Sequence, residues 1–110
     1  MIRSVLIVLL LTGITHVRLS SQTNNFEKNL ATAASLVNVN ELSRALLTIE
    51  DILIKKPDYL PAQELKIDIL TQMDREKDAL RDVEEYIRMY PDKAEFLYLR
   101  GILRLQKQKY

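Results

Sequence analysis

The chain has 110 residues, which is enough for one small domain, with 16 basic and 15 acidic residues, no cysteine and a single histidine. This charge balance argues against nucleic-acid binding, which requires a clustered basic face. The absence of cysteine excludes both a disulfide framework and a lipid-anchored lipoprotein, which needs a thiol at its cleavage site. Two glycines, three prolines and 28% charged residues favour a helical protein.

The N-terminal segment, residues 1–21, has the pattern of an export signal. Arg3 provides a positive charge, a largely apolar stretch covers residues 5–14, and polar residues follow. The stretch is shorter than the ~20 apolar residues that a membrane-spanning helix needs. We therefore expect residues 1–21 to be a cleaved signal peptide and the protein to be periplasmic or secreted. The alternatives are an uncleaved membrane anchor and an ordinary buried segment.

Apolar residues recur at helical spacing along the rest of the chain. They predict helices at about residues 25–38, 41–55, 60–73, 76–90 and 94–107. Pro57 and Pro91 are expected to end the second and fourth helices, because proline lacks a backbone N–H and restricts the residue before it. Brief polar turns join the first helix to the second and the third to the fourth. Each pair should therefore fold back as an antiparallel hairpin.

Pro57 and Pro91 lie 34 residues apart, and the chain repeats itself at this spacing, which we call the repeat interval. Asp58 matches Asp92, and a further step of the same length carries Ile67 onto Gly101. The apolar or small residues that match across one interval are Ala33 with Ile67, Leu36 with Leu70, Ala45 with Ala79, Leu46 with Leu80, Ile49 with Val83, Ile52 with Tyr86 and Leu53 with Ile87. Matched packing positions beneath a variable surface are typical of stacked repeat units.

This 34-residue helix–turn–helix unit resembles the tetratricopeptide repeat, in which each helix carries a small residue and a proline closes the unit. The chain departs from that pattern at Ile67, at Arg104 and in having no tryptophan. The resemblance implies an all-α fold over residues 25–110, with antiparallel hairpins stacked as a right-handed solenoid. Its units would lie near 26–59 and 60–93, with a partial unit at 94–110. Ala33 and Gly101 match the small residue in the middle of the first helix of a unit. Ala45 and Ala79 match the small residue of the second helix, and Pro57 and Pro91 match the closing proline.

The resemblance also implies a concave surface, formed by the first helix of each unit, that binds a peptide or helix of a partner protein. The residues expected on it are Leu30, Ala34, Val37, Glu64, Leu65, Asp68, Gln72, Tyr98, Leu99, Ile102 and Leu105, together with Glu95. None of them is Lys or Arg, which argues against a clamp for a terminal carboxylate. An apolar surface with a few acids suits an amphipathic helix or an extended apolar segment. The alternative is that Leu30, Leu99 and Ile102 are simply core residues.

The predicted last helix has apolar residues on more than one face, a pattern typical of a buried helix. They are Phe96, Leu97, Leu99, Ile102, Leu103 and Leu105. Two expectations follow from this pattern. Either the sequence is the N-terminal part of a longer repeat protein with a downstream effector domain, or the chain self-associates through the 94–110 helix.

The residues after position 21 offer little for catalysis. They include neither His nor Cys, so the usual nucleophile–base pairs are missing. Adjacent acids such as Glu84 and Glu85 point to different sides of a helix and do not form a metal site. Glu84 with Arg88, and Asp51 with Lys55, instead have the spacing of intrahelical ion pairs. We expect no enzyme activity, cofactor or metal, but an exported, non-catalytic protein-interaction scaffold; the alternative is a membrane-anchored structural subunit.

Overall fold

The computed structural model describes residues 25–108 of the protein. The described residues form helices and no strand, so the predicted all-α class is confirmed for this part of the chain. The predicted signal peptide, residues 1–21, lies outside it. Every described helix lies within one residue of its predicted bounds. The helices are a first one over residues 25–38, then α2 (Leu42–Lys55), α3 (Leu60–Gln72), α4 (Glu76–Met89) and α5 (Ala94–Gln108).

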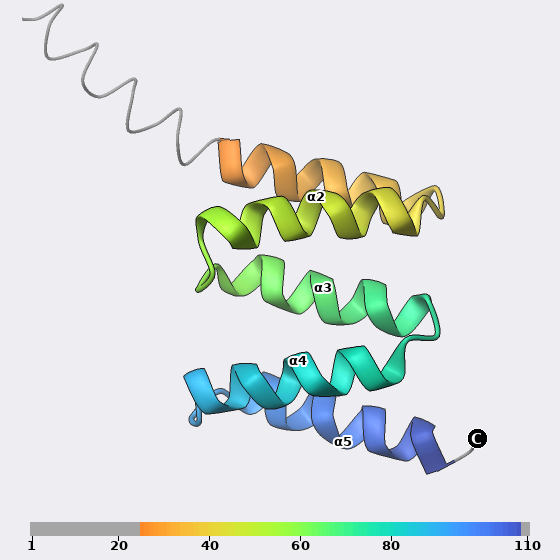
Figure 1. Ribbon diagram of the computed structural model, residues 1–110, viewed down its shortest axis with the longest axis vertical. Helices are drawn as coiled ribbons and strands as arrows, with labels where there is room; N and C mark the ends of the chain where they lie inside the picture. Colours follow the sequence, from red (N-terminus) through yellow and green to blue (C-terminus); the bar gives the residue numbers. More distant parts are fainter. Residues whose placement is uncertain (1–24, 109–110) are drawn as a thin grey trace, which may run out of the picture.

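The helices lie side by side in one stack and alternate in direction (Figure 1). The 25–38 helix, α3 and α5 run one way, and α2 and α4 run the other way. Along the stack, α3 packs against both α2 and α4, and α5 packs against α4. This packing of each helix against its neighbours in sequence is consistent with a helical repeat.

The turns inside the two hairpins have the same backbone geometry. Asn40 and Asp74, separated by one repeat interval, have positive φ angles of 62° and 57°. The next residue in each turn, Glu41 or Arg75, donates its backbone N–H to the carbonyl five residues earlier, at 2.8 Å and 2.9 Å respectively. These bonds form a Schellman motif, which satisfies a free carbonyl at the helix end and reverses the chain.

The connections that follow α2 and α4 are also equivalent. Lys56 and Tyr90 cap these helices, and each donates its backbone N–H to the carbonyl four residues earlier, at 2.8 Å. Pro57 and Pro91 come next and stop the helix, because proline has no N–H to donate and disfavours a helical conformation in the residue before it. The predicted role of the two prolines is confirmed.

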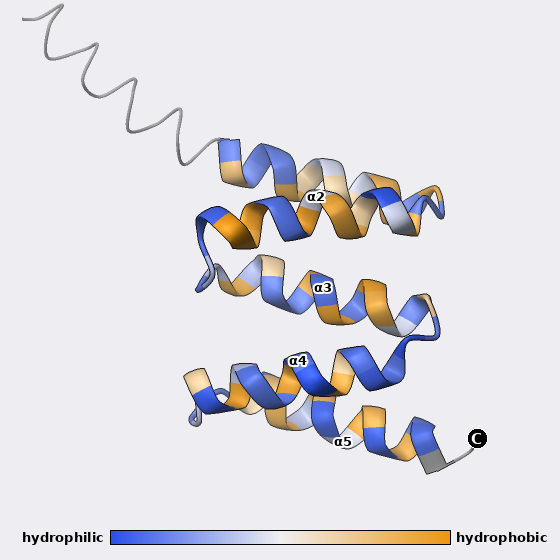
Figure 2. Cartoon of the chain, viewed as in Figure 1, coloured by the Kyte–Doolittle hydropathy of each residue, from blue (hydrophilic) through white to orange (hydrophobic). Residues whose placement is uncertain are grey.

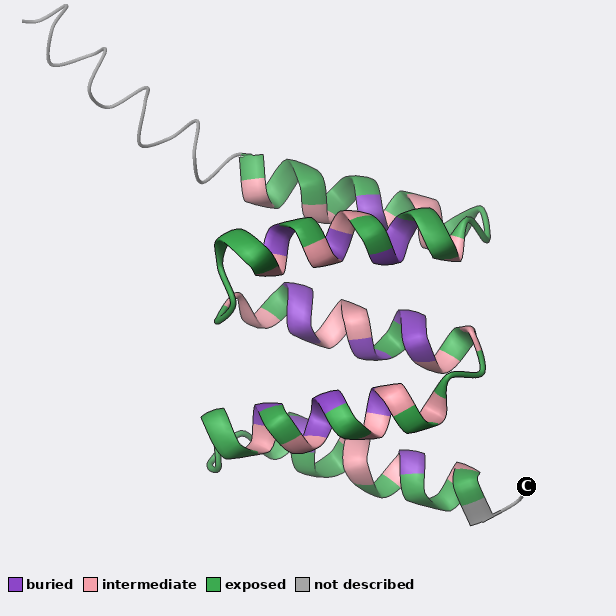
Figure 3. Ribbon diagram, viewed as in Figure 1, coloured by how far each residue is buried: buried purple, intermediate pink, exposed green. Residues whose placement is uncertain are grey.

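The core lies where neighbouring helices face one another, and the outer turns are exposed (Figure 3). Figure 2 shows apolar and polar residues mixed along each helix, as expected of helices that bury one stripe. Four predicted repeat pairs are buried at both positions: Ala33 with Ile67, Ala45 with Ala79, Ile49 with Val83, and Ile52 with Tyr86. The remaining buried apolar residues are Leu46, Ala62, Ile69, Leu70, Phe96 and Leu103.

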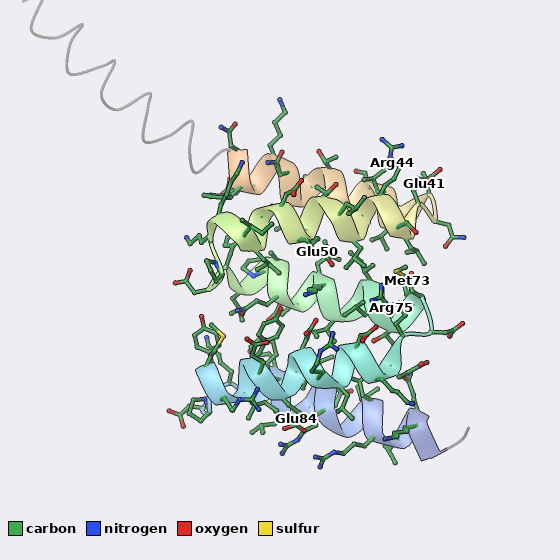
Figure 4. The ribbon with its side chains drawn as sticks, in the orientation of Figure 1. Glu41, Arg44, Glu50, Met73, Arg75 and Glu84 are labelled. Carbon is green, nitrogen blue, oxygen red and sulfur yellow. The ribbon has the colours of Figure 1, made fainter. Side chains whose placement is uncertain are left out.

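The two predicted intrahelical ion pairs do not form in the described part of the chain. Glu84 lies on the side of α4 next to α5 (Figure 4). Its carboxylate is 3.5 Å from Arg100 Nη1 and 3.1 Å from Arg104 Nη2, instead of pairing with Arg88. Likewise no ion pair joins Asp51 to Lys55 among the described residues. The prediction was wrong because an exposed i,i+4 pair gains less than about 1 kcal/mol, which is too little to hold two long side chains together. For Glu84, the neighbouring helix α5 supplies two other partners.

Candidate protein-binding surface

The residues predicted for the concave surface come from the 25–38 helix, α3 and α5, the three helices that share one direction (Figure 1). They divide into two groups by exposure. The half-buried group is Leu30, Ala34, Val37, Glu64, Leu65, Leu99 and Ile102. The exposed group is Asp68, Gln72, Tyr98 and Leu105, and the neighbouring Glu95 is exposed as well.

The half-buried apolar residues contribute to the fold as well as to the surface. Leu30, Val37, Leu65 and Leu99 pack against the buried core. Leu30 and Leu99 are therefore partly core residues, as the alternative interpretation of the sequence held. Substitutions at these positions would change folding and binding together, so they are poor probes of binding alone.

The exposed group offers one aromatic ring, one aliphatic side chain and two acids. Tyr98 is 71% exposed and Leu105 is 64% exposed. On α3, Gln72 Nε2 donates a hydrogen bond to Asp68 Oδ2 at 3.0 Å, which orders the carboxylate one helical turn away. An exposed tyrosine with a nearby apolar residue is a common contact of protein interfaces, because the ring buries a large area at a small entropic cost.

Lys66, the one basic residue of α3, is held in the contact between α3 and α4. Its Nζ lies 3.1 Å from Asp82 Oδ2, and the Asp82 side chain is only 10% exposed. The carboxylate thus neutralises the ammonium group within the hairpin. A partner's terminal carboxylate would have to compete with Asp82 for this cation, which agrees with the sequence argument against a carboxylate clamp.

Two polar side chains that the sequence analysis did not single out fix the loop between α2 and α3. Gln63 is fully buried, and its Nε2 donates to the Pro57 carbonyl at 2.7 Å. Tyr90 Oη, from the following hairpin, donates to the Asp58 carbonyl at 3.4 Å. These contacts join the end of one unit to the next one. The only signal of these contacts in the sequence was Gln63, a polar residue within the apolar packing stripe of α3.

The perturbed titratable groups have structural causes. Burial raises the pKa of the Tyr86 phenol, and the negative charges of Asp82 and Glu85 raise it further. The hydrogen bond from Arg75, 2.8 Å long, lowers the pKa of the Asp78 carboxyl. No group of three or more potential metal ligands occurs among the described residues.

Two cavities lie outside the predicted surface. One of about 460 Å³, between the start of α4 and the end of α5, is lined by residues of both charges: Asp74, Glu76, Lys77 and Lys107. The other, of about 370 Å³, lies between the start of the 25–38 helix and the end of α2, and is lined by Asn25, Phe26, Asn29, Asp51, Ile52 and Lys55. Neither includes a predicted surface residue, and neither gathers groups of one chemical kind.

The last helix buries one of its apolar faces and exposes the other. Phe96 and Leu103 are buried, with Phe96 0% exposed. The Phe96 ring centroid lies 5.4 Å from that of Tyr86 on α4. Leu97 and Leu105 are 41% and 64% exposed. The predicted second apolar face of this helix is therefore open in the described part of the chain.

Comparisons with known proteins leave the family open. No family model matches the chain, and no curated protein or solved structure was found to be similar to it. Among residues 25–108, none of the helices combines the length and apolar character needed to cross a bilayer.

Proposed function

We propose that the protein is a non-catalytic interaction module of the tetratricopeptide-repeat kind, which binds a helix or an extended peptide of a partner protein. The observation that carries this proposal is the backbone equivalence of the two hairpins at the repeat interval. Their positive φ angles lie at Asn40 and Asp74, and their helix caps lie at Lys56 and Tyr90. Stacked units of this kind form extended surfaces that suit peptide binding.

The binding surface in this proposal centres on the exposed side chains of α3 and α5. Tyr98 and Leu105 supply apolar contact, while Asp68 and Glu95 supply negative charge. A complementary ligand would be amphipathic, with an apolar stripe beside at least one basic residue. The sequence alone favoured an apolar segment as the ligand. Several leucines of the predicted surface are half-buried, so acids make up a larger share of the exposed surface and the expected ligand is more basic.

We place this module outside the cytoplasm, as part of the same proposal. The support is the pattern of residues 1–21, in which Arg3 precedes the apolar stretch at 5–14. Intact mass measurement of the protein from its native cells tests the location. A chain that starts at Gln22 agrees with export, and a chain that keeps Met1 contradicts cleavage.

A peptide-display selection on the purified chain tests the binding role. We expect selected peptides to be amphipathic and basic. Asp68→Lys and Tyr98→Glu should each weaken them by about tenfold or more, equivalent to at least about 1.4 kcal/mol. Leu47→Glu on α2 is the matched control, because Leu47 is 64% exposed, like Leu105, and is not a predicted surface residue. Circular dichroism should show unchanged helicity in all three variants.

Two results contradict this proposal. One is the failure of any peptide to bind saturably. The other is equal weakening by Leu47→Glu and by Tyr98→Glu, which would show that the selected peptides recognise exposed apolar residues in general.

A further inference from the structure

The exposed side of α5 has buried counterparts in the two preceding units. Gly101 lies one repeat interval after Ile67 and two intervals after Ala33. Ala33 is 0% and Ile67 is 1% exposed, whereas Gly101 is exposed and a Cβ added there would meet no packing partner within 4 Å. Leu97 and Leu105 lie one turn before and one turn after Gly101 on the same side of the helix. We call Leu97, Gly101 and Leu105 the end surface.

The equivalent side of α3 shows what kind of element covers such a surface. There, α4 runs antiparallel to α3 and packs against it (Figure 1). The apolar stripe that α4 buries consists of Ala79, Val83 and Tyr86. Its Asp82 lies 3.1 Å from Lys66 of α3. An antiparallel amphipathic helix with an acid beside its apolar stripe is thus the form of cover found within this chain.

The charges beside the end surface favour the same kind of helix. Arg100, Arg104 and Lys107 lie on one flank of α5, and Arg100 is the counterpart of Lys66 in the next unit. Asp74 and Glu76 line the same cavity as Lys107, whereas Glu84 alone contacts both Arg100 and Arg104, and one carboxylate does not balance these two positive charges. An antiparallel two-fold pairing of two α5 helices would bring like-charged flanks together, so repulsion opposes a second copy as the cover.

We propose that the end surface binds an amphipathic helix of a separate protein, antiparallel to α5, with acidic residues beside Arg100 and Arg104. Gly101 allows close approach of the two helices, because no side chain separates their backbones there. Leu97 and Leu105 flank this point and supply the apolar contact. The end surface shares Leu105 with the surface in the proposed function, whereas Leu97 and Gly101 belong to the end surface alone and Asp68 on α3 belongs to the other surface alone.

The probe for this proposal is a synthetic peptide of residues 75–90, which carries the α4 stripe and Asp82. Fluorescence anisotropy with the purified full chain should show saturable binding. Gly101→Glu should weaken it by at least about tenfold, because it places a charge at the centre of the surface. A Cβ added at Gly101 meets no packing partner within 4 Å and the position is exposed, so the fold should be retained. Leu47→Glu is the matched control and should leave the affinity unchanged.

The charge requirement has its own test in the peptide. An Asp82→Lys peptide should bind several-fold more weakly than the 75–90 sequence, and the difference should shrink at high salt. Asp68→Lys in the protein should leave the affinity for the 75–90 peptide unchanged. That variant separates this site from the surface in the proposed function, since each site then responds to its own substitution.

Three results would overturn the proposal. One is the absence of saturable binding at peptide concentrations up to about 1 mM. Another is binding that Gly101→Glu does not change. The third comes from sedimentation velocity: a wild-type dimer that Gly101→Glu dissociates would show that the occupant is a second copy of this chain.

Discussion

Asn40 and Asp74 hold the same left-handed backbone conformation at equivalent points of the two hairpins, with φ angles of 62° and 57°. This conformation costs most residues roughly 1–2 kcal/mol, because Cβ approaches a carbonyl oxygen. The short polar side chains of Asn and Asp lower that cost. The repeat interval is therefore present in the backbone of the turns as well as in the spacing of apolar side chains.

Substitutions at these turns should show the cost directly. Asn40→Ala and Asp74→Ala should each lower the free energy of unfolding by about 1 kcal/mol, because Ala does not readily adopt positive φ. Asn40→Gly should match or exceed the wild type, since Gly adopts this conformation without steric penalty. Urea denaturation measures each value. Val39→Ala, at a 67% exposed neighbour, should change it by less than about 0.5 kcal/mol. Ala variants as stable as the Gly variant would contradict the turn assignment.

Adjacent residues on α5 should differ strongly in their effect on stability. Phe96 is fully buried and its ring lies 5.4 Å and 6.3 Å from the rings of Tyr86 and Tyr90. Phe96→Ala should cost roughly 3–5 kcal/mol, the range for a buried aromatic residue. Leu97→Ala, at a position 41% exposed, should cost less than about 1 kcal/mol. Chemical denaturation compares them, and similar losses would show that α5 does not pack as described.

Glu84 should contribute modestly to the contact between α4 and α5. Its side chain is 34% exposed and lies within 3.5 Å of Arg100 and Arg104. Glu84→Gln should lower the free energy of unfolding by up to about 1 kcal/mol at low salt, with a smaller loss in about 1 M salt. Glu85→Gln, one residue along and exposed, is the control. A larger effect of the control substitution would argue against the interhelical pairs.

Alkaline pH should destabilise the protein through Tyr86. Burial raises the pKa of this phenol, so the folded chain keeps it neutral while the unfolded chain ionises near pH 10. Its contribution to stability is complete below about pH 10 and falls at higher pH, by about 1.4 kcal/mol per pH unit for one proton. Tyr86→Phe should flatten this part of the profile, and Tyr98→Phe, at an exposed ring, should not. Parallel profiles for all three proteins would contradict the prediction.

Helical periodicity and proline positions were sufficient to predict every described helix to within one residue. Those signals are local: Pro57 and Pro91 act on the residue before them, and a buried stripe recurs every three or four residues. The match across the repeat interval also identified packing positions, since Ile49 and Val83 are both fully buried.

The sequence was less informative about the degree of burial and about contacts between helices. Periodicity places Leu30 and Leu65 on a face, but it does not show that they pack against the core there. Nor does spacing within α4 reveal that Glu84 pairs with arginines of α5, because those partners belong to the next helix along the chain. The burial of Gln63 likewise depends on the Pro57 carbonyl supplied by the preceding loop.

The most direct test of the proposed binding role is to map a selected peptide on the protein by amide chemical shifts in solution. Saturating peptide should perturb residues around Asp68, Gln72, Tyr98 and Leu105, on α3 and α5. The amides near Leu47, on the exposed side of α2, should stay unchanged. Perturbations confined to that side of α2, or spread evenly over the stack, would contradict the assignment of the binding surface.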